Sequence, residues 1–175
     1  MRTPSSRHLR AATLGLAAAS LTPPCLAIDQ AQRERAHEMI GRATTYLLAQ
    51  QHESGGWAIP DDPSAPTFPA ITGLVLNALA LHPDEVPTAP AEEDRDAAAQ
   101  RAIEFILGAV QPDGGIYLEM LPSYNTAICI SALSRWRERD PRLDPVINDA
   151  VAFLRTIQWG HPAPPANADG SRSPA

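Results

Sequence analysis

The sequence predicts an all-α protein built from repeated helical hairpins, and three observations support this. Residues 42–57, which end in a glycine turn and a tryptophan, have the same layout as residues 101–116. The layout begins a third time at residues 150–158 and then stops. Apolar residues recur at helical intervals, and no segment reads convincingly as a strand. Because repeated helix-and-turn units stack and bury a shared core, we expect about five helices and no sheet.

The first two helices are predicted over residues 29–51 and 70–82. Asp29 is a suitable N-cap, because its carboxylate can accept a hydrogen bond from the first turn of a helix. The second helix is apolar around most of its circumference, so we expect it to be buried on more than one side. Proline-rich loops over residues 58–69 and 83–91 follow these two helices.

The remaining three helices are marked by their ends. Acidic residues from Glu92 to Asp96 open the third, where they complement the positive end of the helix dipole. The fourth is predicted over residues 123–138. The fifth opens at Asp144, an N-cap followed by proline at the first helical position. We expect the first helix to pair with the second and the third with the fourth, while the fifth lacks a partner.

The first 27 residues have the pattern of a secretion signal. Three arginines precede an uncharged, mostly apolar run over residues 11–21, and a small-x-small cleavage site ends at Ala27. The apolar run is too short to span a membrane. We therefore predict a signal peptide over residues 1–27, a periplasmic or extracellular location, a repeat domain over 28–159 and a disordered tail over 160–175.

The charge of the chain limits its partners. The net charge is −6, every basic residue is arginine, and removal of the signal would take away three arginines and no acid. An acidic balance argues against nucleic acid and anionic membrane surfaces as partners. Cys129 would be the only cysteine left, so no intramolecular disulfide is expected, and its apolar surroundings predict a buried, inert thiol.

The first repeat unit resembles the QW motif of squalene-hopene and oxidosqualene cyclases. Every defined position of that motif is filled at its proper spacing, by Arg42, Ala43, Tyr46, Leu47, Gln51, Gly55 and Trp57. Over about residues 30–160, the chain is thus similar to the prenyltransferase and squalene-oxidase repeat proteins, which also include the protein prenyltransferase β subunits. The resemblance implies an α/α toroid, here incomplete at two and a half hairpins. A chain that stops inside its third unit has the pattern of a truncated toroid. Its exposed apolar surface would then be covered by self-association or by a partner chain.

The motif residues have a structural explanation. The amide of Gln51 lies at a helix end, where it can serve backbone groups that lack partners, and Trp57 can cover it. Gly55 and Gly56 permit positive φ at the turn. The later units keep only part of the pattern, at Phe105, Asp113, Gly114, Gly115 and Gln158. In the second unit, Val110 and Ile116 stand where the glutamine and the tryptophan belong, and Gln111 is one place late.

The catalytic motifs of the related families are not found in the sequence. The Asp-x-Asp-Asp acid of the cyclases is missing, and the histidines and Cys129 lack the paired spacing of zinc ligands. We therefore predict no catalytic residue, no metal and no cofactor, and a non-catalytic binding or structural module. The alternative is an isoprenoid-processing enzyme, by cyclisation or prenyl transfer, whose active site is completed by missing sequence or by other chains.

Five residues are candidates for contact with an apolar ligand. Three aromatic residues lie in or beside the hairpin turns, and two polar residues lie on the second helices, which line the inside of such toroids by the resemblance. They are Trp57, Tyr117, Tyr124, Asn125 and Thr72. The alternative is that Trp57 clamps the turn, Tyr117 packs, and Tyr124 contacts a neighbouring helix.

Overall fold

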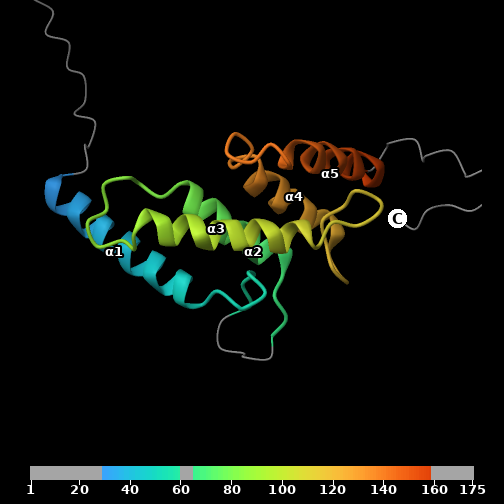
Figure 1. Cartoon of the computed structure of the whole chain (residues 1–175). Coiled ribbons are helices and arrows are strands. Elements are labelled where there is room, and N and C mark those ends of the chain that lie inside the picture. Colours follow the sequence, from blue (N-terminus) through green and yellow to red (C-terminus); the bar gives the residue numbers. More distant parts are fainter. Residues whose placement is uncertain (1–28, 60–64, 159–175) are drawn as a thin grey trace, which may run out of the picture.

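A computed structural model describes residues 29–59 and 65–158, which form five helices (Figure 1). They are α1 Gln30–Ala49, α2 Pro69–Ala80, α3 Glu92–Leu107, α4 Pro122–Leu133 and α5 Leu143–Ile157. These described ranges contain no strand, only an isolated antiparallel bridge between Val110 and Ile116. The all-α class with five helices is therefore confirmed for this part of the chain, whereas the toroid stays a prediction. The predicted signal peptide and the tail after residue 160 lie outside the described residues.

The helix ends follow local chemistry, with two corrections to the predicted bounds. Asp29 caps α1 as predicted, since its Oδ1 accepts a hydrogen bond from the amide of Gln32 at 2.7 Å. Helix α4 ends at Leu133 and gives way to turns, so the predicted extension to residue 138 is wrong. Helix α5 begins at Leu143, which places Pro145 within the first turn rather than at its first position. Proline is tolerated there because the first four amides of a helix have no partner inside it.

Helices α2 and α4 form the centre of the fold. Their backbones pack most closely with each other, and then α4 packs on α5 and α2 on α3. The close approach of α2 and α4 depends on Gly73, where a Cβ atom would lie 3.0 Å from Cγ2 of Ile128. The predicted pairing of the first helix with the second, and of the third with the fourth, is therefore not the closest packing. Each second helix packs instead on the first helix of the following unit.

The first helix is the least integrated of the five. Only Gly41 and Thr44 are buried on α1, whereas α3 buries five residues against α2 and the core. Gly41 lies against Thr88 in the loop before α3, where a side chain would collide with that threonine. Figure 1 shows α1 at one edge of the molecule and α5 at the other.

Candidate functional site

Gln51 joins the first turn to the next repeat unit. Its Nε2 donates hydrogen bonds to the carbonyl oxygens of Gly55 and Ala98, both at 2.9 Å. Its Oε1 accepts from Arg101, at 2.9 Å from Nε and 2.5 Å from Nη2. The motif glutamine thus holds its own turn closed and fastens that turn to α3.

Trp57 fastens the same turn to its own unit. The side chain is 2% exposed, and its Nε1 donates to the carbonyl oxygen of Leu47 at 2.8 Å. Its backbone amide donates to Oγ1 of Thr72 at 3.0 Å. The tryptophan therefore links the end of α1 to the beginning of α2, which is a contact within the fold.

The second turn repeats the threonine bond without the tryptophan. The amide of Ile116 donates to Oγ1 of Thr126 at 2.9 Å, in the same way as Trp57 to Thr72. Gln111, one place out of register, donates from Nε2 to the carbonyl oxygen of Tyr117 at 2.8 Å. Sequence analysis missed Thr126, although a threonine near the start of both second helices was the available signal.

Both turns are seated on the first helix of the following unit. Gly55 and Gly114 have φ of 89° and 87°, values that favour glycine, whereas Gly56 and Gly115 do not have positive φ. A Cβ atom on Gly55 would collide with the carbonyl of Arg101, and one on Gly114 would lie 2.9 Å from the carbonyl oxygen of Asp149. The turns therefore fit only because these positions lack a side chain.

The second glycine of each turn has a different role. A Cβ atom on Gly56 would lie 3.0 Å from the ring of Phe105, and one on Gly115 would lie 3.0 Å from the ring of Phe153. These two aromatic residues hold equivalent positions on α3 and α5. The second glycine thus makes room for the aromatic ring of the next unit, and Gly115 also makes room for the ring of Tyr117 in its own turn, which would lie 2.5 Å away.

The other motif residues lie in mixed surroundings. Arg42, Ala43 and Tyr46 are exposed on α1, Leu47 is half-buried, and Gln158 is exposed at the end of α5. Asp113 accepts from the amide of Gly115 at 2.9 Å and from the Tyr117 hydroxyl at 2.7 Å. The bond to Asp113 raises the pKa of Tyr117, because loss of the phenol proton would break it.

The structure does not bring the five ligand candidates to one cavity. Thr72 and Asn125 are buried, and Asn125 is saturated: Oδ1 accepts from the amide of Ala70, while Nδ2 donates to two carbonyl oxygens before α4. Tyr117 lies tilted against Phe153, with ring centroids 5.7 Å apart. Only Tyr124 exposes about half of its surface, at 55%. Contact of these residues with a ligand stays a prediction.

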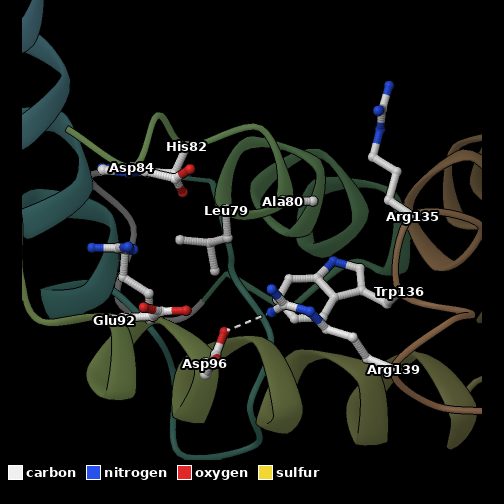
Figure 2. Close-up of a pocket in the computed structure, with 10 residues that line it drawn as sticks. Leu79, Ala80, His82, Asp84, Glu92, Asp96, Arg135, Trp136 and Arg139 are labelled. Atoms are coloured by element: carbon white, nitrogen blue, oxygen red, sulfur yellow. Dashed lines mark hydrogen bonds and ion pairs between the residues drawn. The ribbon is translucent and has the colours of Figure 1, made fainter. Parts of the chain in front are cut away.

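A cavity of about 140 Å³ lies elsewhere, at the C-terminal end of α2 (Figure 2). Its walls come from the end of α2 and the loop after it, the start of α3 and the turns after α4, and they are Leu79, Ala80, His82, Asp84, Glu92, Arg95, Asp96, Arg135, Trp136 and Arg139. The guanidinium carbon of Arg139 lies 5.2 Å from the ring centroid of Trp136, and Nη1 of Arg139 lies 3.2 Å from Oδ1 of Asp96. This ion pair joins the turns after α4 to α3 across the cavity.

In this cavity, the ring nitrogen Nε2 of His82 is buried without a hydrogen-bond partner among the described residues. Its Nδ1 lies 2.8 Å from the carbonyl oxygen of Pro83, which can only accept, so Nδ1 carries the hydrogen. In the neutral ring, Nε2 is then an acceptor, and it is buried without a partner among the described residues. Sequence analysis treated the histidines only as possible zinc ligands and did not foresee this cavity. Three arginines and three carboxylates balance in its wall, an arrangement suited to a small polar molecule that donates to Nε2.

The described residues hold no group of three or more His, Cys, Asp or Glu side chains placed to bind a metal ion. Cys129 is fully buried on α4, with Sγ 3.4 Å from the carbonyl oxygen of Pro69. Burial raises the pKa of this thiol to about 12, because the thiolate would lose its hydration. No helix in the described part of the chain combines the length and the apolar character needed to cross a bilayer.

Comparison with known proteins adds no relative. No family model matches the chain, and no curated protein and no solved structure matches it either.

Proposed function

We propose that this chain is an exported, non-catalytic helical-repeat module of the squalene-cyclase-like kind, which acts by binding or holding other chains. The observation that supports this is the use made of the motif residues. The polar side-chain atoms of Gln51, Trp57 and Thr72 form hydrogen bonds with backbone groups or with Arg101. Side chains committed in this way stabilise the repeat and leave no polar atom for a reacting substrate.

The surroundings of the other polar groups agree with this proposal. A general acid or base must reach its substrate and have a pKa suited to proton transfer. The one described thiol is buried, and its pKa of about 12 keeps it protonated near neutral pH. The wall of the cavity beside His82 contains no hydroxyl or thiol side chain that could act as a nucleophile.

The test is incubation of the purified chain with farnesyl diphosphate and, separately, with squalene. We expect no product by mass spectrometry and no rise in the melting temperature. A ligand present at one hundred times its Kd would add about 2.7 kcal/mol to the stability. That gain would raise the melting temperature by several degrees.

A saturable rise in melting temperature, or any cyclised or transferred product, would support the isoprenoid-processing alternative instead. The variant Tyr124→Ala tests whether such a ligand contacts the predicted residues, because Tyr124 is the one ligand candidate that is largely exposed. If the predicted ligand contact exists, this variant loses the stabilisation by ligand. Its own stability should change little, since exposed side chains contribute little to folding.

A further inference from the structure

Helices α2 and α4 lie side by side and run in the same direction. Near their beginnings, the amide of Ala70 donates to Oδ1 of Asn125 at 2.9 Å. Near their ends, Nε of Arg135, which follows α4, donates to Oδ1 of Asn77 at 2.9 Å. Residue numbers rise together along this contact, so the two helices are parallel and form a two-helix layer.

The two sides of this layer differ, because α3 packs on α2 and α5 packs on α4. On α2, Leu74 and Ala78 each come one place after a residue in contact with α4. On α4, Tyr124 and Ala127 each come one place before a residue in contact with α2. One step around a helix is about 100°. In parallel helices, a step forward on one and a step back on the other turn the side chains to the same side, which here is the side away from α3 and α5.

This side of the layer is exposed and uncharged. The exposed fractions are 53% for Leu74, 60% for Leu81 and 55% for Tyr124. Neither α2 nor α4 contains a charged residue. Helical spacing continues the two stripes to Leu81 and Ser131. We call these exposed stripes the α2–α4 face, which consists of Leu74, Ala78, Leu81, Tyr124, Ala127 and Ser131.

Two properties of the α2–α4 face favour a second copy of this chain as its partner. Three large side chains and three small ones share the face, so the large side chains of one copy can pack over the small ones of another. A surface of this kind is self-complementary, as a symmetric contact requires. The chain has a net charge of −6, so two copies repel each other, but no like charges meet where these faces approach.

We propose that two copies of this chain form a dimer by packing their α2–α4 faces together across a two-fold axis. Arg135 lies about one helical turn beyond Ser131, so its charge stays at the rim, where interfaces are polar. The inference deepens the proposed function and rests on it, because it names the chain that the module binds and the surface that binds it.

Sedimentation velocity of the purified full chain over a wide concentration range tests for this dimer. We expect a monomer–dimer equilibrium without larger species, because a symmetric contact is closed. Leu74→Glu should weaken the dimer at least about tenfold, since it brings an unpaired charge into the interface. The matched control is Met39→Glu, the same kind of change at a residue of α1 that is 63% exposed. A monomer at every concentration, growth beyond the dimer, or equal effects of the two variants overturns the proposal.

A second pair of variants separates specific packing from general stickiness. Ala127→Leu adds apolar surface to the face but fills the space that a large side chain of the other copy needs, so we expect a weaker dimer. Ala43→Leu makes the same change at an exposed position of α1 and should leave the dimer unchanged. All three substituted residues on α1 and α4 are exposed, so the variants should keep the helical circular dichroism of the wild type. Stronger association of Ala127→Leu would indicate non-specific apolar contact and overturns the proposal.

Failure of this inference can be told from failure of the proposed function. An isoprenoid product would overturn the proposed function, whereas the dimer would still be seen by sedimentation. A monomer that forms no product overturns the dimer alone. A monomer that floats with phosphatidylcholine vesicles would show that the face binds lipid, and that result also overturns the dimer.

Discussion

The turn glycines Gly55 and Gly114 carry backbone conformations that other residues adopt at a cost. Each has positive φ and faces a carbonyl of the next unit. We expect Gly55→Ala and Gly114→Ala each to lower the free energy of unfolding by about 1–3 kcal/mol, measured by urea denaturation. Gly55→Ala should cost more, since its Cβ atom approaches the opposing carbonyl more closely.

Gly108 provides the control for these substitutions. It is right-handed, with φ of −67°, and an added Cβ atom would meet its nearest neighbour at 3.4 Å. Gly108→Ala should therefore be neutral or slightly stabilising, because alanine restricts the unfolded chain without strain in the folded one. Equal losses at all three glycines would contradict this account of the turns.

The buried hydroxyl of Thr72 provides a second prediction. Thr72→Val keeps the side-chain shape but removes the acceptor for the Trp57 amide, which is buried with it. An unsatisfied buried donor costs about 1–3 kcal/mol. We expect a loss of that size in the free energy of unfolding. Thr45→Val, at an exposed residue whose hydroxyl bonds only within α1, should change it by less than about 0.5 kcal/mol.

Cys129 makes stability depend on alkaline pH. Its thiol has a pKa of about 12 in the folded chain, above the ordinary value of 9.0, because it is buried. The unfolded chain therefore releases this proton first, so the contribution is complete below pH 9 and is lost as pH rises toward 12. The slope is about 1.4 kcal/mol per pH unit. Cys129→Ala should remove this part of the alkaline decline, as urea denaturation at several pH values would show. Parallel declines in both proteins would contradict it.

At the scale of the elements, Gln51 makes all the hydrogen bonds that join the end of α1 to α3 in the described chain. Gln51 makes the bonds to Ala98 and Arg101, while α1 itself buries only two residues. We expect Gln51→Ala to speed hydrogen exchange of α1 and the first turn roughly tenfold, with little change in α4. Gln50→Ala is the matched control, because its exposed side chain lies one residue away and away from that contact. An equal effect of the two substitutions would count against the clamp.

Helices could be predicted from the sequence better than their ends. Apolar spacing located all five, and Asp29 marked the start of α1 through its own side chain. The end of α4 was missed because tertiary contacts decide it. Arg135 bonds Asn77 of α2, and Arg139 pairs with Asp96 of α3, which holds this segment in turns. Such partners lie too far away in sequence for a local pattern to reveal them.

At the scale of the whole molecule, the repeat predicted the fold class but not how the units meet. Sequence similarity indicated that Gln51 and its turn were structural, yet it could not show that the turn sits on α3 rather than on its own hairpin. The cavity beside His82 was also beyond reach, because its wall combines residues from three separate segments. Of the ligand candidates, burial separated Thr72 and Asn125 from Tyr124, and burial depends on packing.

The two interfaces between units are unequal, and this gives the molecule a weak point under mechanical load. The first turn is tied to α3 by three side-chain hydrogen bonds of Gln51, to Ala98 and Arg101. In the described chain, Gln111 of the second turn bonds only carbonyls of its own unit, and this turn meets α5 through Gly114 at Asp149 and through Tyr117 at Phe153. A tension applied at the two ends of the chain would pass through both contacts in series. Helix α5, however, also packs on α4 and buries four residues, whereas α1 buries only two. The attachment of α1 should therefore yield first, releasing the first helix while the other four stay joined.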